Sequence, residues 1–260
     1  MIKKNKKIGL PPGSVVFTGS RKVEEVQIHY VKYDNEVLEE KTLNNQGRII
    51  FHKSNNETVD WYDIRGLHDT ELIEQIGSTF NIHPLVLEGV SDTHQRPKFE
   101  EYDNGIFIVI KALHFDKTKF KVSKEQVALF FKIGFVASFQ ETESDLFDAV
   151  RKRIQNGKGR VRLKGADYLA YALIDVIVDN YFFVLESIEE EIESLEDRML
   201  ENQDSKNKSE IHQLKKELLS IRKSIAPLRE AIGRFAKTDN EMVLTTTSFF
   251  VRDLYDHTIQ

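Results

Sequence analysis

The sequence contains no cysteine, and this absence narrows what the protein can be. It rules out disulfide bonds, a thiolate nucleophile and every zinc site that needs a cysteine ligand. A chain without cysteine is also typical of proteins that work in a reducing compartment. The chemistry of the protein must therefore come from its other polar side chains.

The sequence also lacks an uninterrupted apolar run of the roughly 20 residues that a membrane-spanning helix needs. The richest helical stretch, Leu169 to Leu185, is interrupted by Asp175, Asp179 and Asn180. The basic N-terminus, MIKKNKKIGL, is not followed by the apolar core of a signal peptide. We therefore expect a soluble polypeptide that is not exported.

A large excess of charge of either sign is missing as well. Lys and Arg number 37 and Asp and Glu number 42, which gives a net charge of −5 over 260 residues. This mild negative charge argues against nucleic acid as a partner. Catalytic motifs are absent too, since there is no phosphate-binding glycine loop, no nucleophile elbow and no HExxH pair. Because the eight histidines are scattered along the chain, we do not expect an enzyme.

The first half of the chain mixes strand and helix patterns. A helical pattern runs from His68 to Phe80 with Asp69 as its cap, and Pro84 lies where another helix can start. Early strands are expected at Val15–Thr18, Val26–Tyr33, Arg48–His52 and Trp61–Ile64. Four more strands are expected after Pro97, with turns at 103–105, 116–117 and 134. The pattern predicts an α/β (α+β) fold, in which helices pack on a mixed sheet.

The second half is helical. We expect a short helix from Asp145 to Ile154 and a long one from Ala166 to Asn202. After a polar break, ENQDSKNKS, a heptad pattern continues over about four repeats and predicts a second long helix, kinked at Pro227. The two helices form an antiparallel hairpin in which an acidic arm faces a basic arm. A last helix is expected to begin near Thr246, and its helical spacing of apolar residues continues to the end of the sequence at Gln260.

A few carboxylates stand in unusually apolar surroundings. Asp175 and Asp179 lie one helical turn apart in YLAYALIDVIVDNYFFVL, and Glu88 lies in HPLVLEGV. A carboxylate buried alone is costly, so each of these needs a partner. The simpler interpretation is a salt bridge or a helix cap within the chain, and the alternative is a subunit interface where carboxylates meet a cation. Asp253 and Asp256 lie on the last predicted helix, and spacing alone does not bring these acids together.

Five blocks of the sequence resemble one known family. They are GLPPGSVVFTG (9–19), IHPLVLEGVSDTHQRPKFEEYDNGIFIVIK (82–111), ADYLAYALIDVIVDNYF (166–182), IRKSIAPLRE (221–230) and FFVRDLYDHTIQ (249–260). In this order they are similar to the cytoplasmic portion of CorA-type magnesium/cobalt transporters. The resemblance covers nearly the whole chain, and the HQRPK and RDLYDH elements are specific together.

The resemblance implies an architecture. An α/β/α regulatory domain (1–164), with its mixed sheet sandwiched between helices, is followed by two long antiparallel helices (165–240) and the start of a stalk helix (246–260). In the family, five chains form a funnel, and the stalk continues into membrane helices and a GMN pore loop that this sequence does not contain. The full-length homopentamer is therefore expected in the cell membrane, with this portion in the cytoplasm.

The resemblance also implies metal ligands. Asp253 matches a stalk carboxylate that helps to bind a divalent ion between subunits, Asp175 matches one supplied by the adjacent chain, and Glu88 matches the first of an acidic pair. The second member of that pair is usually Asp, whereas this sequence has Gly89. The candidates to replace the lost charge are Asp92 and Asp179.

These residues imply regulation by cytosolic magnesium, for which cobalt or another divalent ion can substitute. Carboxylates at one interface repel each other until a divalent cation bridges them, so bound Mg2+ favours a closed pore. The expected partners are copies of this chain and magnesium ions. Two alternatives stay open, namely a zinc-transporting relative and a soluble scaffold protein that binds partners through the heptad hairpin.

Overall fold

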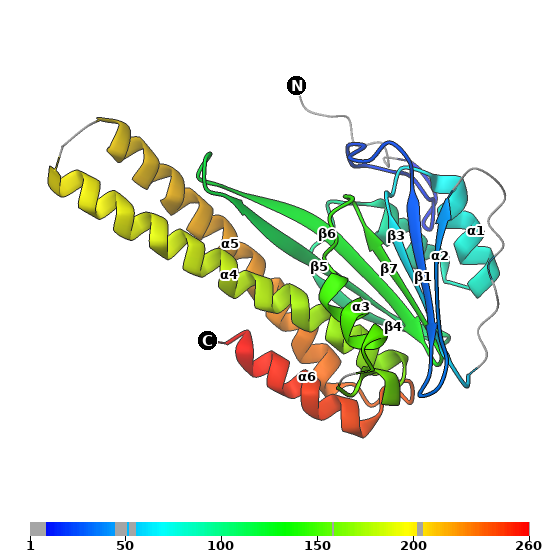
Figure 1. Cartoon of the computed structure of the whole chain (residues 1–260). Helices are drawn as coiled ribbons and strands as arrows, with labels where there is room; N and C mark the ends of the chain where they lie inside the picture. Colours follow the sequence, from blue (N-terminus) through cyan, green and yellow to red (C-terminus); the bar gives the residue numbers. More distant parts are fainter. Residues whose placement is uncertain (1–8, 45–50, 52–55, 158, 202–204, 260) are drawn as a thin grey trace.

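A seven-stranded mixed sheet with helices on both faces forms the centre of the protein (Figure 1). The computed structural model describes residues 9–44, 51, 56–157, 159–201 and 205–259. The strand order is β2-β1-β3-β7-β6-β5-β4, and β3 pairs with β7 in parallel while the other neighbours pair antiparallel. The strands are β1 (Gln27–Tyr33), β2 (Leu38–Asn44), β3 (Val59–Arg65), β4 (Lys98–Tyr102), β5 (Gly105–Asp116), β6 (Lys121–Lys132) and β7 (Phe135–Gln140). The predicted mixed sheet between helices is confirmed.

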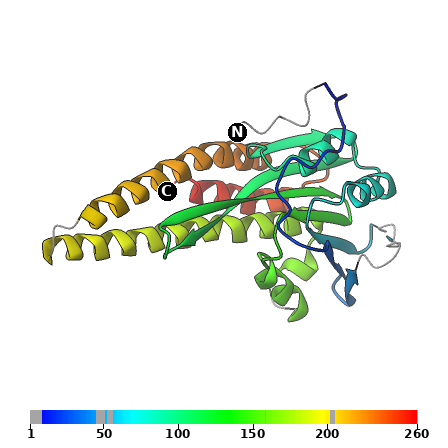
Figure 2. The ribbon, with the colours of Figure 1, turned by 90° about the horizontal axis from the view of Figure 1, so that it is seen from above.

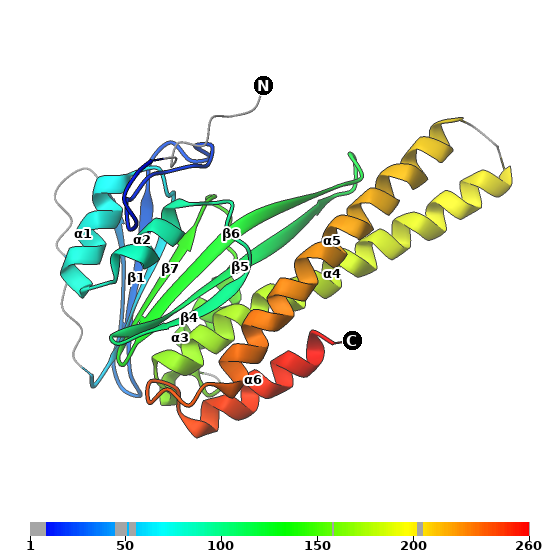
Figure 3. The same ribbon diagram turned by 180° about the vertical axis from the view of Figure 1, so that it is seen from behind.

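The helices divide between the two faces of the sheet (Figures 1 and 3). One face carries α1 (Thr70–Phe80) and α2 (Pro84–Ser91). The other carries α3 (Asp148–Gln155), the short 3-10 helix Val161–Leu163, α4 (Ala166–Glu201), α5 (Ser205–Lys237) and α6 (Thr245–His257). Because successive side chains of a strand point to opposite faces, Trp61 belongs to the core under α4 and Tyr62 to the core under α1 and α2.

Local signals placed several boundaries correctly. The Asp69 carboxylate accepts a hydrogen bond from the Leu72 backbone N–H (3.0 Å) at the start of α1. This is the N-cap contact for which aspartate is favoured. Pro84 begins α2, where its fixed φ and missing N–H cost nothing. Gly134 turns the chain between β6 and β7 with a φ of 72°, which favours glycine.

The first strands were predicted less well. Val15–Thr18 forms no strand, because this segment lies against α2, where the Thr18 N–H donates to the Ser91 carbonyl oxygen (3.2 Å). The edge strand β2 was not expected, since its sequence LEEKTLN is mostly polar. Most of Arg48–His52 lies outside the described residues, and Phe51 has no regular structure.

Three helix boundaries also differ from the prediction. The short helix α3 begins at Asp148 and not at Asp145, whose carboxylate instead pairs with Arg65 (2.9 Å). The polar break is shorter than expected, because α5 already begins at Ser205. The last helix ends at His257, where the turn at Thr258 closes it.

The two long helices lie side by side as a hairpin, and α6 packs against both of them (Figure 2). The heptad pattern is confirmed, because fully buried residues recur every seven positions along it. These residues are Ile188 and Leu195 in α4, and Leu214, Ile221, Leu228 and Phe235 in α5. An ion pair between the arms joins Arg198 of α4 to Glu210 of α5 (3.2 Å). In this pair the base is on α4 and the acid on α5, whereas the sequence led us to expect an acidic α4 arm and a basic α5 arm. The helix α5 continues through Pro227.

The described residues hold one helix that is long and apolar enough to cross a membrane, Ala166–Leu200 in α4. This helix contains the stretch Leu169 to Leu185, whose apolar run is interrupted by Asp175 and Asp179. Half of the most apolar 18-residue stretch of this helix is buried inside the protein. The first half of α4 packs on the sheet through residues such as Leu173 and Ile177, so its apolar character has a structural use here.

A buried carboxylate joins the strands at the centre of the sheet. Asp63 of β3 is fully buried and accepts hydrogen bonds at Oδ1 from Ser138 Oγ and Gln140 Nε2 of β7, each at 2.6 Å. At Oδ2 it accepts from the guanidinium groups of Arg65 (3.1 Å) and Arg151 (3.0 Å). Both arginines are themselves buried, at 4% and 7% exposure. Asp63 and Asp145 together therefore supply the counter-charges of two buried arginines, and Asp63 ties α3 to the sheet.

Replacing Asp63 is expected to destabilise the fold strongly. Asp63→Ala leaves Arg65 and Arg151 with only the partly exposed Asp145 as counter-ion, and breaking a buried ion pair typically costs about 3–5 kcal/mol. The free energy of unfolding in urea measures this loss. Asp148→Ala is the control, because Asp148 pairs with Lys152 on the exposed side of α3 (2.6 Å) and its loss should matter little. Equal effects of the two substitutions would contradict the central role of Asp63.

Candidate metal-binding faces

One group of predicted ligands lies where α4 and α6 pack together. Asp175 is half-buried on α4, Asp179 is exposed one turn further on, and Asp253 is exposed on α6. Burial, and after it the negative charge of Asp179, raise the pKa of Asp175. Nearby Arg153 and His257 act in the opposite direction. The ionised form of Asp175 is therefore less favourable here than in water, and a nearby cation would stabilise it.

Aromatic rings hold this part of α4 against α6. Phe250 of α6 packs on Tyr168 and Tyr171 of α4, with ring centroids 5.2 and 5.6 Å apart. The Arg160 guanidinium lies over the Phe250 ring at 5.1 Å. Among the smaller influences on Asp175, the side chain of Tyr171 acts to lower its pKa. The two acidic helices are thus fixed relative to each other by packing.

The second group of predicted ligands, Glu88 and Asp92, lies on α2. Glu88 Oε2 accepts a hydrogen bond from the Gly13 backbone N–H (2.7 Å), and Asp92 Oδ1 accepts from the Thr18 hydroxyl (2.9 Å). Asp92 Oδ2 also accepts from the Gln95 side-chain amide (3.1 Å). In one chain, these two carboxylates hold the segment around Gly13 and Thr18 against α2.

The structure does not bring the five predicted ligands together within one chain. Glu88 and Asp92 belong to the α2 face of the sheet, whereas Asp175, Asp179 and Asp253 belong to the α4 face (Figure 1). Among the described residues, no group of three or more His, Asp or Glu side chains lies close enough to hold a metal ion.

Comparison with known proteins decides the family. A family model described as "CorA-like Mg2+ transporter protein" matches residues 56–260. The chain belongs to the CorA family. It is 42% identical over 255 residues to the cobalt/magnesium transport protein CorA of Thermotoga maritima, which covers 98% of this chain and 72% of that protein. CorA proteins form a transporter family and not an enzyme family, in agreement with the absence of catalytic motifs.

Solved structures share the CorA fold seen here. The soluble domain of CorA from Methanocaldococcus jannaschii matches with a TM-score of 0.73 and 22% identity, over 89% of this chain and 88% of that one. The cytoplasmic domain of ZntB from Vibrio parahaemolyticus matches with a TM-score of 0.67 and 16% identity, over 90% of this chain and 88% of that one. At these identities the likeness concerns the fold.

Gly89 occupies the position at which the CorA resemblance leads us to expect an aspartate. It is buried, and a Cβ atom added to it would lie 2.8 Å from the Phe107 ring and 3.7 Å from Lys98 Nζ. Phe107 is itself fully buried, so it has little room to move. An acidic side chain at position 89 would therefore require the core beside it to rearrange.

Two contributors to these faces were missed in the sequence. Tyr171 stands four residues before Asp175, a spacing that puts both on one side of a helix. His257 stands four residues after Asp253, and its Nε2 lies 3.9 Å from Asp253 Oδ2. The i, i+4 spacing would have indicated both. The contact between Gly13 and Glu88 spans 75 residues and has no local signal.

Removing the charge of Asp175 should stabilise the metal-free protein. An acid with a raised pKa in the folded state makes its unfavourable contribution above that pKa and loses it as the pH falls through it. Asp175→Asn is therefore expected to raise the melting temperature at pH 7 slightly, because Asp175 is only partly buried and solvent screens part of its charge. The gain should disappear in acid, where wild-type Asp175 is protonated.

Asp256→Asn is the matched control for this measurement, since Asp256 is exposed on α6. Melting temperatures of the wild type and both variants from pH 7 to pH 4, in the presence of a chelator, give the comparison. An Asp175→Asn variant that melts at or below the wild-type temperature at pH 7 would contradict the conclusion that the charge of Asp175 destabilises the folded protein.

Proposed function

We propose that this chain is the cytoplasmic magnesium-sensing and gating part of a CorA-family transporter of Mg2+, with Co2+ as a possible second ion. Divalent ions bind between subunits and favour the closed state of the pore. The relationship to the Thermotoga protein, named for cobalt and magnesium transport, supports the choice of ions. In this proposal the full-length protein is a membrane-bound homopentamer.

The observation that carries the proposal is the division of the acids between two faces. Asp175 and Asp253 lie on the α4 face and Glu88 and Asp92 on the α2 face, and on neither face do three such side chains of the described residues come close enough together to hold a metal ion. A site built from both faces needs two chains. Carboxylate oxygens are the ligands that Mg2+ prefers, and Mg2+ keeps several of its waters, so few protein ligands suffice.

Electrostatics then links the metal to the arrangement of the subunits. Without a cation, the carboxylates of two neighbouring chains repel each other, and Asp175 is already unfavourable when ionised. A bound ion removes the repulsion only where the faces meet. The ion therefore stabilises the closed arrangement in proportion to its preference for that state. Falling cytosolic magnesium would release the interfaces and open the pore.

The absence of an aspartate at position 89 leaves this site with fewer charges. Because Gly89 packs against Phe107, the remaining acids must bind the ion without it. Asp92 is engaged by Thr18 and Gln95, and Asp179 is exposed beside Asp175, so Asp179 is the better placed of the two to assist.

A magnesium titration of the purified chain tests the proposal. Melting temperature should rise with MgCl2 and saturate, beyond the effect of NaCl at equal ionic strength, and light scattering should show larger assemblies with magnesium. Asp253→Ala should abolish the saturable rise, because it removes the exposed α6 carboxylate, while Asp256→Ala should retain it. A wild type without a saturable response, or an Asp253→Ala variant with an unchanged one, would reject the proposal.

A further inference from the structure

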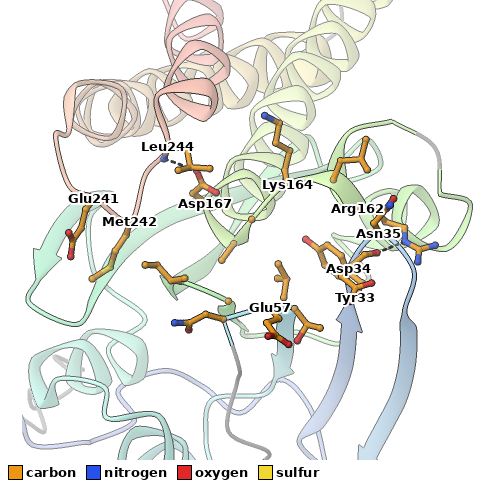
Figure 4. A pocket seen from close by; sticks show the side chains of 18 residues that line it. Tyr33, Asp34, Asn35, Glu57, Arg162, Lys164, Asp167, Glu241, Met242 and Leu244 are labelled. Atoms are coloured by element: carbon orange, nitrogen blue, oxygen red, sulfur yellow. Dashed lines mark hydrogen bonds between the residues drawn. The ribbon is translucent and has the colours of Figure 1, made fainter.

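The start of α6 is fixed by a residue far away in the sequence. Leu244 is the N-cap residue of α6, and its side chain makes no capping hydrogen bond. Its backbone N–H instead donates to the Asp167 carboxylate of α4 (2.9 Å) across 77 residues of chain, as Figure 4 shows. Asp167 is only 3% exposed. A buried contact of this kind defines where the helix begins.

The same carboxylate also serves α4. Asp167 lies in the first turn of α4, so it faces the N-terminal ends of two helices at once. Helix N-termini carry partial positive charge from their unpaired N–H groups, and two of them placed together repel each other. The Asp167 carboxylate offsets this repulsion. A second link joins the same two helix starts, because Lys164 Nζ donates to Thr246 Oγ1 (3.1 Å).

From this shared start, α4 and α6 run in the same direction (Figures 1 and 3). Asp175 follows Ala166 by nine residues, and Asp253 follows Thr245 by eight. A rise of about 1.5 Å per residue places the two carboxylates about 13.5 and about 12 Å along their helices. They therefore lie at nearly the same height. Both lie close enough to Tyr171 to raise the pKa of its hydroxyl, after the larger effect of burial.

We propose that Asp167 is a positioning residue that fixes the axial register of Asp175 and Asp253 by joining the starts of α4 and α6. The consequence for metal binding rests on the proposed function, but the register itself needs no metal. Asp167 lines an open cavity of about 510 Å3 between the sheet, α4 and the segment before α6, together with Glu57 and Glu241 (Figure 4). The rim residue Glu241 therefore provides a matched control.

A distance between α4 and α6 tests the register directly. Because the chain has no cysteine, Glu186→Cys and Arg252→Cys introduce a unique pair of exposed sites for spin labels. Labelled protein is diluted into an excess of unlabelled protein without metal, so that distances within one chain are measured. Asp167→Ala should shift or broaden the distance distribution by more than about 1.5 Å, the rise of one residue. Glu241→Gln should leave it unchanged.

A second pair of variants removes the donor instead of the acceptor. Leu244→Pro deletes the N–H that Asp167 accepts, at a residue whose φ of −67° already suits proline and whose side chain is 52% exposed. Leu244→Ala keeps the N–H. Leu244→Pro should reproduce the change in distance seen in Asp167→Ala, and Leu244→Ala should not. If Asp167→Ala does not fold, Leu244→Pro by itself tests the role of Asp167. Unchanged distances in Leu244→Pro, or the same change in Glu241→Gln, would overturn the proposal.

The magnesium titration gives the functional consequence. The half-saturating magnesium concentration should rise by about fivefold or more in Asp167→Ala, which is the lower end of typical coupling between sites. An altered register with unaltered magnesium response would overturn the link between register and metal binding. If the wild type itself shows no magnesium response, the proposed function fails while the distances still decide the role of Asp167.

Discussion

The buried charge of Asp63 is the constraint on which the rest of the structure depends. A carboxylate inside a sheet is tolerated only if it is fully paired, and Asp63 meets this demand by drawing Arg65, Arg151 and the side chains of β7 around itself. Arg151 comes from α3, and its guanidinium also lies over the Trp61 ring at 5.4 Å. The helices of the α4 face therefore pack on a surface whose geometry is set by a polar network.

The carboxylates that we propose as metal ligands are arranged differently, because they are divided between the two faces of the sheet. The sheet separates Glu88 and Asp92 from Asp175 and Asp253, and within the described part of the chain no three acidic or histidine side chains lie close enough to hold a metal ion. Under the proposed function, such a division makes the affinity for a cation a property of the assembly. It also explains how a family member can lack an acid at position 89, since packing against Phe107 replaces the missing side chain there.

Much of the fold was predictable, because its signals are local. The cap at Asp69, the proline at the start of α2 and the heptads of the hairpin each depend on residues a few positions apart. The strand β2 was missed because an edge strand needs few apolar residues, and Val15–Thr18 was wrong because contacts with α2 outweigh its β propensity. Asp175, Asp179 and Glu88 stood out by their apolar surroundings, and the resemblance to the CorA family supplied their expected role as metal ligands. Their division between faces, and the contact of Asp167 with Leu244, required the structure because they join distant segments.

The length of α4 has a mechanical consequence. Its 36 residues form a single rod of about 54 Å, which is packed on the sheet along its first half and forms one arm of the hairpin beyond it. The Tyr181 hydroxyl, which donates to the Lys111 carbonyl oxygen (2.8 Å), holds the rod to β5 near its middle. A tilt of about 5° displaces one end by almost 5 Å relative to the other, taking about 1.5 Å per residue. The helix therefore couples the position of its start beside Asp167 to the position of the tip of the hairpin.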